Sequence, residues 1–353
     1  MKTDDFNFDL PQRLVAQYPP QERGQSRLMT LDRVAGERAH RTVTELPFIL
    51  CENQFLSPDG EAPLLVFNDT RVRKARVKAK SETGAETEFL FLEEKEGGFL
   101  WKTLVKRARR KKAGNVFVFF DGEGKQTAKA VISDFEGDYV ILEFEERLTE
   151  SWFEKYGSVP LPPYIKRKDN QQDSERYQTV YAKQTGSAAS PTAGLHFTNE
   201  LLDALKARGI ASAFVTLHVG LGTFLPVRAE NVEDHVMHEE SFFITGENAA
   251  VIEEAMARKR KIIAVGTTSL RALESAFCDG KLKRGVQSTS IFIYPGYKFK
   301  AVDALFTNFH TPLSTLLMLV CAFAGRELIL ESYAEAVRKE YRFFSYGDAM
   351  LIY

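Results

Sequence analysis

Six short runs rich in Val, Phe, Thr and Ile occupy the middle of the chain, and no helical period interrupts them. Each break between the runs contains at least one glycine. Short strands at such regular spacing are typical of a small barrel or sandwich. We therefore predict an all-β barrel domain at residues 69–147, inserted into a larger domain. The predicted strands are 71–80, 86–93, 99–106, 115–120, 126–134 and 138–145.

The chain on either side of the insert follows a different pattern. Leu64–Asn68 has the apolar composition of a buried strand, and Thr149–Tyr156 has the pattern of a short helix. Strands that alternate with helices beyond that point predict a mixed α/β domain, built from residues 1–68 and 148–353. Further helices are predicted at 199–208, 247–260, 268–277, 313–324 and 328–341, and further strands at 213–217, 261–265, 290–294 and 304–309.

Length and composition agree with a two-domain globular protein. The 353 residues exceed the size at which one core usually stops growing, and 44% hydrophobic and 27% charged residues are near globular averages. Three widely spaced cysteines argue against a disulfide framework, and no metal site is indicated. The acidic first residues lack the apolar core of a signal peptide, and the stretch 316–324 is too short to span a bilayer. We expect a cytoplasmic protein.

The strand predicted at 261–265 runs into a turn and a helix that carry Gly266, Thr267, Thr268 and Arg271. Glycine permits a tight turn, and hydroxyl side chains satisfy free N–H groups at a helix start. A helix N-terminus after a strand favours a bound carboxylate or phosphate, to which an arginine could add a bidentate contact. An ordinary helix cap is the alternative.

The segment from Asp234 to Glu240 holds two histidines and three carboxylates in seven residues. Three interpretations remain open: a metal site, acid–base or ligand contact, and a solvated polar turn. On a helix, the spacing of His235 and His238 would present both imidazoles together, but no third ligand with metal spacing is evident. His238 and Glu239 are the candidates taken from this turn.

Two further histidines stand beside small residues. His218 precedes Gly220 and Thr223 at the end of a predicted strand, and His196 follows Thr192 and Gly194. Glycines permit a ligand to approach the backbone closely, but a lone Gly-x-Gly is not a dinucleotide fingerprint. A hydrogen-bonded core histidine is the alternative for His218. The chain has neither a Gly-x-Ser-x-Gly elbow nor a phosphate-binding Walker motif.

Two polar groups near the end of the chain complete the candidates. Asn308 and His310 lie at the end of a predicted strand, and Tyr346 and Asp348 lie in an aromatic C-terminal stretch. Such a stretch could line a site for a cation or dock the terminus. Basic residues gather in the β insert at 71–80 and 106–112, where they form either a solvated face or a contact for RNA phosphates.

Long blocks of the chain resemble the S-adenosylmethionine:tRNA ribosyltransferase-isomerase family of queuosine biosynthesis. The densest blocks are PTAGLHF from Pro191, FVTLHVGLGTF from Phe214, AVGTTSLRALES from Ala264, IFIYPGY from Ile291, TNFH from Thr307 and YRFFSYGDAML from Tyr341. Shorter blocks extend the similarity to Asp5 and through 66–76 and 161–181. Ser187, Ser190 and a long segment at 50–63 depart from the expected pattern without removing any of these blocks.

The resemblance implies a reaction. The ribosyl moiety of S-adenosylmethionine moves to the aminomethyl group of 7-aminomethyl-7-deazaguanine at the tRNA wobble position and is isomerised to give epoxyqueuosine. Adenine and methionine leave, so S-adenosylmethionine is a consumed substrate and no separate cofactor is expected. The family also implies an α/β domain with an inserted small barrel. A monomer is the simplest assembly.

The resemblance also suggests roles, which stay hypotheses at this point. His196, His218, His238 and Glu239 are the acid–base candidates. The methionine or ribose end is assigned to Gly266, Thr267, Thr268 and Arg271. Asp69 and Arg71 face either the RNA or the pocket. The other candidates for substrate binding are Thr192, Gly194, Gly220, Thr223, Tyr294, Asn308, His310, Tyr346 and Asp348.

Two other functions remain alternatives. A conventional S-adenosylmethionine-dependent RNA methyltransferase would want a glycine-rich turn after an early strand, and the first third of the chain shows none clearly. It would release S-adenosylhomocysteine, whereas the reaction above releases adenine and methionine. A non-catalytic tRNA-binding module would bind RNA without dependence on S-adenosylmethionine.

Overall fold

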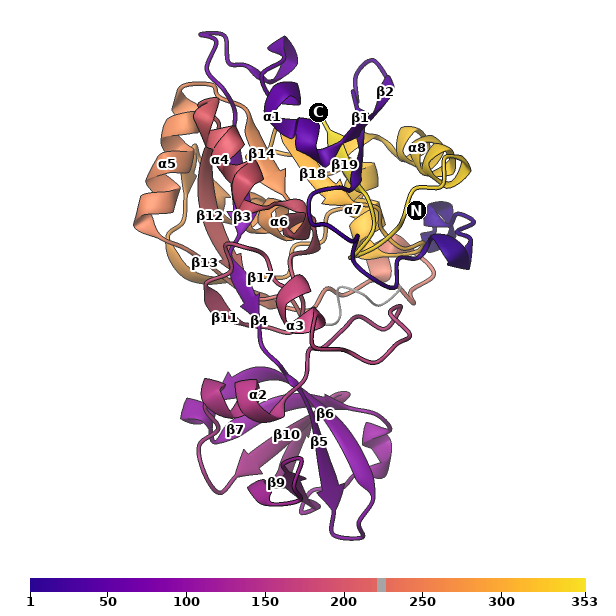
Figure 1. The fold of residues 1–353 in the computed structure, drawn as a ribbon, viewed down its shortest axis with the longest axis vertical. Coiled ribbons are helices and arrows are strands. Elements are labelled where there is room, and N and C mark those ends of the chain that lie inside the picture. The colour runs from indigo at the N-terminus through magenta and orange to yellow at the C-terminus, as the bar shows by residue number, and fades with distance from the viewer. Residues whose placement is uncertain (221–226) are drawn as a thin grey trace.

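The structure, a computed structural model, describes residues 1–220 and 227–353. It confirms a mixed α/β main body and a closed six-stranded antiparallel barrel, joined by a narrow connection (Figure 1). The barrel strands are β5 (Arg76–Ser81), β6 (Glu86–Lys95), β7 (Leu100–Val105), β8 (Val116–Phe120), β9 (Gln126–Glu136) and β10 (Tyr139–Phe144). They lie inside the predicted domain limits 69–147, and those limits themselves stay a prediction.

The barrel closes in the order β10-β7-β6-β5-β8-β9 around an aromatic interior. Alternate residues of each strand point inward, so that every second position of β7 is buried. Phe91, Trp101 and Phe119 are almost fully buried there, and the Phe91 ring meets Trp101 edge to face and Phe119 at a tilt. The aromatic-rich runs of the sequence therefore form the inside of the barrel.

The first predicted strand of the barrel, at 71–80, is wrong in one respect. The chain forms two strands there, β4 (Thr70–Val72) and β5, with Arg73, Lys74 and Ala75 between them. β4 pairs in parallel with β11 (Gln184–Ser187) and lies outside the barrel. The two strands form a short ribbon, called the β4–β11 ribbon below. The chain passes through this ribbon as it leaves the main body and enters the barrel.

The main body is built on a nine-stranded sheet in the order β17-β13-β12-β3-β14-β18-β19-β1-β2. Its central four strands are parallel: β12 (Ala211–Leu217), β3 (Leu64–Asn68), β14 (Ile262–Val265) and β18 (Ala304–Asn308). The outer strands are β1 (Arg27–Leu31), β2 (Arg38–Thr42), β13 (Glu240–Ile244), β17 (Gly285–Thr289) and β19 (Ala349–Ile352), and β15 (Phe277–Cys278) forms a separate hairpin with β16 (Lys281–Leu282).

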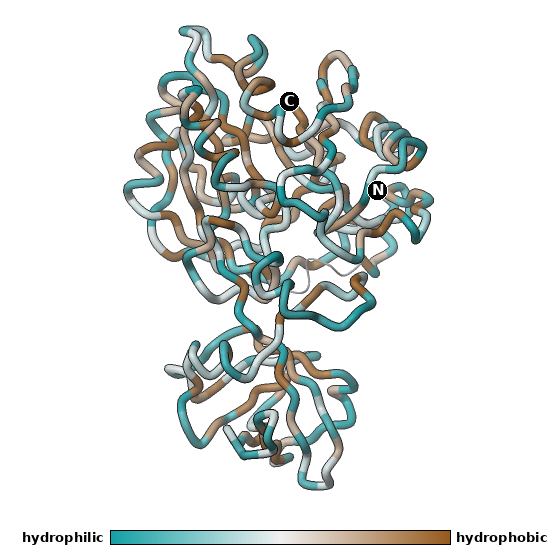
Figure 2. The backbone as a smooth tube through the Cα atoms, viewed as in Figure 1, coloured by the Kyte–Doolittle hydropathy of each residue, from teal (hydrophilic) through white to brown (hydrophobic). Residues whose placement is uncertain are grey.

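Helices cover both faces of this sheet. The α-helices of the described residues are α1 (Leu46–Ile49), α2 (Glu150–Tyr156), α3 (Asp173–Arg176), α4 (Asn199–Ala207), α5 (Gly246–Ala257), α6 (Thr267–Ala276), α7 (Thr315–Ala324) and α8 (Arg326–Arg338). α2 and α3 lie near the junction with the barrel (Figure 1). The brown, apolar segments of Figure 2 concentrate in the strands, and the teal segments in the loops.

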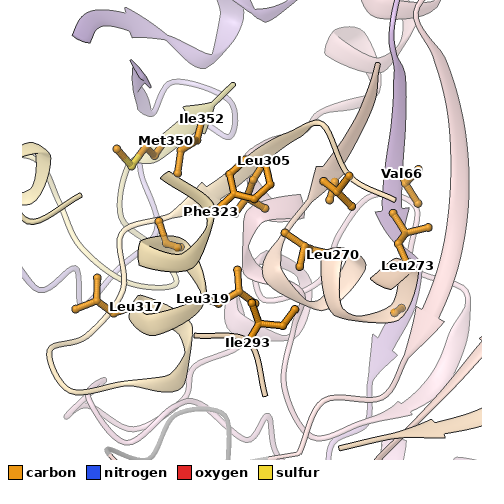
Figure 3. Packing of buried hydrophobic residues seen from close by; sticks show 14 of the residues in the cluster. Val66, Leu270, Leu273, Ile293, Leu305, Leu317, Leu319, Phe323, Met350 and Ile352 are labelled. Atoms are coloured by element: carbon orange, nitrogen blue, oxygen red, sulfur yellow. The ribbon is translucent and has the colours of Figure 1, made fainter. Parts of the chain in front are cut away.

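The alternation along β3 shows why both faces are covered. Val66 packs with Leu270 and Leu273 of α6 in one hydrophobic core, which continues to α7 and β19 (Figure 3). Its neighbours Leu65 and Phe67 belong to a second core, on the side of α4. A strand buried on both faces needs a continuous apolar run, and the run Leu64–Asn68 supplies one.

The strand predicted at 290–294 is also wrong, because the strand in that region, β17, ends at Thr289. The strands β1, β2, β11, β13 and β19 were not predicted. The predicted helices at 199–208, 247–260, 268–277, 313–324 and 328–341 correspond to α4, α5, α6, α7 and α8 within a few residues.

Candidate active site

The four parallel strands of the sheet end on the same edge. β3 ends at Asn68, β12 at Leu217, β14 at Val265 and β18 at Asn308. Ligands of parallel α/β sheets bind beyond the carboxyl ends of the strands. The barrel is attached at this edge, since β3 continues into β4 and then into β5 (Figure 1). The histidine- and hydroxyl-rich turns of the sequence therefore lie at the edge that faces the junction.

A cavity of about 620 Å³ lies at the junction, and its volume is in the range of small-molecule sites. Both parts of the molecule form its walls. From the barrel come Leu92, Glu93, Glu94, Lys102, Leu104 and Tyr139. From the main body and the connection come Arg73, Thr185, Gly186, Ala188, His218, Val219, Gly220, His235, Met237, His238, Glu239, Glu240, Ser241, Ser288 and Thr315.

His218 is the histidine that the fold fixes most firmly in this wall. It follows β12, and its Nδ1 lies 2.8 Å from the hydroxyl of Thr70 on β4. A Cβ added at Gly186 of β11 would lie 2.8 Å from Cε1 of His218, so only glycine leaves room for the ring. Burial lowers the pKa of His218, and the charge of Arg73 lowers it further. The imidazole is therefore neutral near pH 7.

The turn from Asp234 to Glu240 lies in the same wall, but not as a helix. A short 3-10 turn ends at Asp234, His235 is extended, and no helix intervenes before β13 begins at Glu240. His238 and Glu239 line the cavity and are exposed, with the His238 ring beside Tyr139 of the barrel at 6.3 Å between centroids. Burial, and then the neighbouring His238, lower the pKa of His235.

Glu240 is buried and forms an ion pair with Arg271 of α6. The carboxylate also accepts a hydrogen bond from the backbone N–H of Gly220 at 3.3 Å. Within the described residues, Nε and Nη2 of Arg271 have no hydrogen-bond partner, although both are buried. Unpaired buried donors cost about 1–3 kcal/mol each, and a ligand carboxylate could remove that cost.

The start of α6 is joined to the cavity through Asn68. The Nδ2 of Asn68 donates to the hydroxyl of Thr268 at 3.2 Å, and its Oδ1 accepts from the backbone N–H of Thr70 at 3.1 Å. Thr70 in turn contacts His218. Gly266 has φ +92° at the turn before the helix, and Thr267 is buried beside it. Neither Gly266 nor Thr267 lines the cavity.

His196 belongs to a different, sealed network. Its Nε2 accepts from Nδ2 of Asn308 at 2.9 Å, and Asn308 also accepts from the hydroxyl of Thr192 at 3.0 Å. Burial lowers the pKa of His196 to about 3, so the ring is neutral. At Gly194, an added Cβ would lie 2.1 Å from the Tyr181 hydroxyl. The structure therefore gathers Thr192, Gly194, His196 and Asn308 away from the cavity wall.

Other predicted residues have partners that hold the main body together. His310 contacts the Thr307 hydroxyl at 2.9 Å, and burial lowers its pKa to about 3. Tyr346 donates to Asp173 at 3.0 Å, and Asp348 accepts from the backbone N–H groups of Arg27 and Arg342. The remaining predictions are placed as follows: Tyr294 packs beside Phe292, Asp69 accepts from the Thr216 hydroxyl, Arg71 is exposed on β4, and Thr223 lies outside the described residues.

The wall residues that were not among the sequence candidates include Arg73, Lys102, Tyr139 and Glu240. Lys102 and Tyr139 lie on the barrel strands β7 and β10, and no local motif marks them. Arg73 belongs to a basic run, but its pairing with Glu150 and its position over the Trp101 ring depend on the fold. Glu240 stands in the acidic turn 234–240. A strand begins at this residue, and no strand was predicted there.

Among residues 1–220 and 227–353, no group of three or more His, Cys, Asp or Glu side chains is placed to hold a metal ion. In the same part of the chain, no helix is long and apolar enough to cross a membrane.

Residues 3–352 match the model of a family described as queuosine biosynthesis protein. The chain belongs to this family. It is 52% identical over 356 residues to the S-adenosylmethionine:tRNA ribosyltransferase-isomerase of Treponema denticola, with all of both chains covered. It is 48% identical over 358 residues to the protein of the same name from Borreliella afzelii, covering all of this chain and 99% of that one.

A solved structure agrees with these relatives. The crystal structure of S-adenosylmethionine tRNA ribosyltransferase from Thermotoga maritima is 36% identical in sequence, with a TM-score of 0.55. It covers 99% of this chain and 100% of that chain. The family resemblance that the sequence blocks carry is confirmed.

Proposed function

We propose that this protein transfers the ribosyl moiety of S-adenosylmethionine to 7-aminomethyl-7-deazaguanine at the tRNA wobble position and isomerises it to epoxyqueuosine. The full-length relatives with the corresponding name support the enzyme class. The observation that carries the proposal is the cavity between barrel and sheet, where a neutral histidine, an exposed histidine and carboxylates share one wall.

The charge of the cavity suits the two reacting groups. Its walls hold four carboxylates, Glu93, Glu94, Glu239 and Glu240, against the two cations Arg73 and Lys102. Because Glu240 is paired with Arg271 behind the wall, three carboxylates face two cations. The remaining excess of one negative charge attracts the sulfonium of S-adenosylmethionine and the aminomethyl group of the base, which is cationic when protonated. The aromatic ring of Tyr139 offers a further surface for a cation.

His218 is the proposed base that takes the proton from the ribose carbon next to the sulfonium. Its lowered pKa keeps it neutral, as a base must be. The Thr70 hydroxyl has one proton, and its Oγ1 also lies 3.4 Å from the carbonyl oxygen of Gln184, which can only accept. With that proton directed to Gln184, Thr70 accepts from Nδ1–H of His218, and Nε2 is left free to accept a proton.

Further residues in the wall, and Arg271 behind it, serve the remaining steps. His238 and Glu239 are the proposed acid–base pair for the departure of adenine, because both are exposed in the cavity. Arg271 is the proposed contact for the methionine carboxylate, since Nε and Nη2 together match a carboxylate side-on. S-adenosylmethionine is consumed, and no separate cofactor enters the proposal. We further propose that the protein acts as a cytoplasmic monomer.

Mass spectrometry of tRNA that bears the deazaguanine precursor tests the proposal. Incubation with the protein and S-adenosylmethionine is expected to add the mass of the rearranged ribosyl group to the base and to release adenine and methionine in equal amounts. His218→Ala should lower this product by a factor of about 10²–10⁴. Release of S-adenosylhomocysteine, or RNA binding with no product, would instead support the methyltransferase or the binding module.

A further inference from the structure

A second, larger cleft lies beside the connection to the barrel. Its volume is about 980 Å³, and it shares no lining residue with the first cavity. Arg71 and Val72 of β4 line it together with Arg23, Glu154 of α2 and residues of the segment 171–182 around α3. Neighbouring residues of a strand point to opposite faces, so Arg71 points away from the face on which Thr70 meets His218. The two spaces therefore flank the β4–β11 ribbon.

The second cleft has the opposite charge from the first. Its lining holds the four cations Arg23, Arg71, Lys74 and Arg176, against the two carboxylates Glu154 and Glu175. That leaves an excess of two positive charges, although the whole chain has a formal net charge of −1. A local excess of this sign in a cleft attracts anions.

Neutral carbonyl groups hold the two inner arginines in place. Arg23 donates to the carbonyl oxygens of Gln178 at 2.8 Å and Glu175 at 3.3 Å. Arg176 donates to those of Pro20 at 2.7 Å and Gln21 at 3.3 Å. These bonds fix the direction of each guanidinium without neutralising its charge.

No carboxylate oxygen of the described residues lies within 4.0 Å of a guanidinium nitrogen of Arg23, Arg71 or Arg176. Lys74 differs, because its ammonium lies 3.1 Å from Glu154. Burial lowers the pKa of Arg23, and the nearby charge of Arg176 lowers it further. A bound anion would relieve the repulsion between these two cations.

We propose that this cleft binds phosphates of the RNA strand whose base enters the first cavity. Sheets pack about 10 Å apart face to face, so the two faces of this ribbon are separated by about one sheet thickness, and one RNA segment can contact both. Arginines that are oriented but not neutralised suit a phosphodiester backbone, whose contacts position the RNA without reading its sequence. The inference rests on the proposed function for the identity of the RNA.

Arg71→Glu tests this assignment with little risk to the fold, because Arg71 is exposed and forms no ion pair within the described residues. The probe is a fluorescently labelled anticodon stem-loop RNA, and anisotropy gives Kd at several salt concentrations without S-adenosylmethionine. We expect Kd to rise about tenfold near 0.1 M salt, and the slope of log K against log salt to shrink by about 1. Arg71→Lys should restore both values.

Arg338→Glu is the matched control, since Arg338 is exposed at the end of α8, away from the cleft. It makes the same charge change and should leave Kd and the salt slope at the wild-type values. In the modification assay, Arg71→Glu should raise KM for RNA and leave KM for S-adenosylmethionine unchanged. Thermal unfolding of each variant shows whether it is folded.

An unchanged Kd and salt slope in folded Arg71→Glu would overturn the inference, as would a wild-type protein that binds no RNA. A polyglutamate peptide is the competitor. If it displaces the RNA, and if Arg71→Glu weakens binding of the peptide but not of the RNA, the cleft binds an acidic peptide and the inference is overturned too. The proposed function fails separately: absence of modified base and adenine, with RNA binding still sensitive to Arg71→Glu, leaves the cleft assignment standing.

Discussion

His218 and His196 stand beside small residues in the sequence, yet the fold gives them different surroundings. His218 lies in the wall of a cavity of about 620 Å³, with one ring nitrogen held by Thr70. His196 lies in a buried network, where its Nε2 accepts from Asn308. Burial lowers the pKa of both, and for His196 the value falls to about 3. Both rings are neutral, but only one faces a space that can hold a substrate.

The difference teaches that neutrality alone does not mark a catalytic histidine. A base also needs a free nitrogen directed at a space where the reacting atom can lie. The cavity wall meets that need at His218, because the barrel closes a space beyond the strand end. His196 instead lines a space of only about 10 Å³, which is too small for a substrate. The predictions below test this contrast.

Removal of the buried ion pair behind the cavity should have the largest effect. Arg271→Leu leaves the buried Glu240 without its cation, which should lower the free energy of unfolding by about 3–5 kcal/mol. Urea unfolding measures the change. The exposed arginine of the Arg258–Glu61 pair is the control, and Arg258→Leu should cost at most about 1 kcal/mol. Equal losses of unfolding free energy in both variants would show that the burial of the Arg271–Glu240 pair does not raise its contribution to stability.

Crowding His218 should impair the reaction more than the fold. In Gly186→Ala, the new Cβ would lie 2.8 Å from Cε1 of His218 and push the ring aside. A displacement of about 1 Å can cost about 10²-fold in rate, and we expect kcat to fall by that order. Gly122→Ala in the barrel, where an added Cβ meets nothing within 4 Å, is the control. A wild-type rate in Gly186→Ala would contradict the role of the ring.

Removal of His196 should impair the fold more than the reaction. His196→Ala leaves an Nδ2 hydrogen of Asn308 unpaired in a buried place, at a cost of about 1–3 kcal/mol. Urea unfolding should show this loss, while kcat per folded molecule stays within about threefold of wild type. His40→Ala, at an exposed histidine on β2, is the control for the loss of an imidazole. A large fall in kcat of folded His196→Ala would contradict the structural role assigned to His196.

The sealed histidines should also make stability depend on pH. Burial lowers the pKa of His310 to about 3, below its value of about 6.5 in an unfolded chain. Its contribution to stability is therefore complete above about pH 6.5 and is lost as the pH falls toward 3. In that window, His310→Gln should flatten the pH dependence of the unfolding free energy by about 1.4 kcal/mol per pH unit. An unchanged slope would show that the ring is protonated in the native state.

Local patterns were sufficient to predict the barrel and the main helices. The alternation along β7 and β10 and the glycine breaks specify short antiparallel strands without any knowledge of distant contacts. The outer strands of the large sheet were harder, because β19 and β1 pair across more than 300 residues of sequence. The boundary at Thr289 was misplaced because apolar residues continue beyond the end of β17.

The site was predictable only in part. Motifs supplied His218, Gly220, His238 and Glu239, which the structure brings into one wall. The barrel side of that wall, with Lys102 and Tyr139, depends on how two parts of the chain meet, and no short motif encodes that. The burial of His196 and His310 also arises from packing. Sequence alone could not separate these residues from His218.

The pH dependence of a single turnover tests the central role of His218 most directly. Adenine release should slow about tenfold per pH unit below the pKa of His218, which burial and Arg73 hold below its usual value near 6.5. His218→Ala should be slower throughout and should lack this acid limb. If folded His218→Ala keeps the wild-type rate, or keeps the same acid limb, another group is the base and the account is wrong.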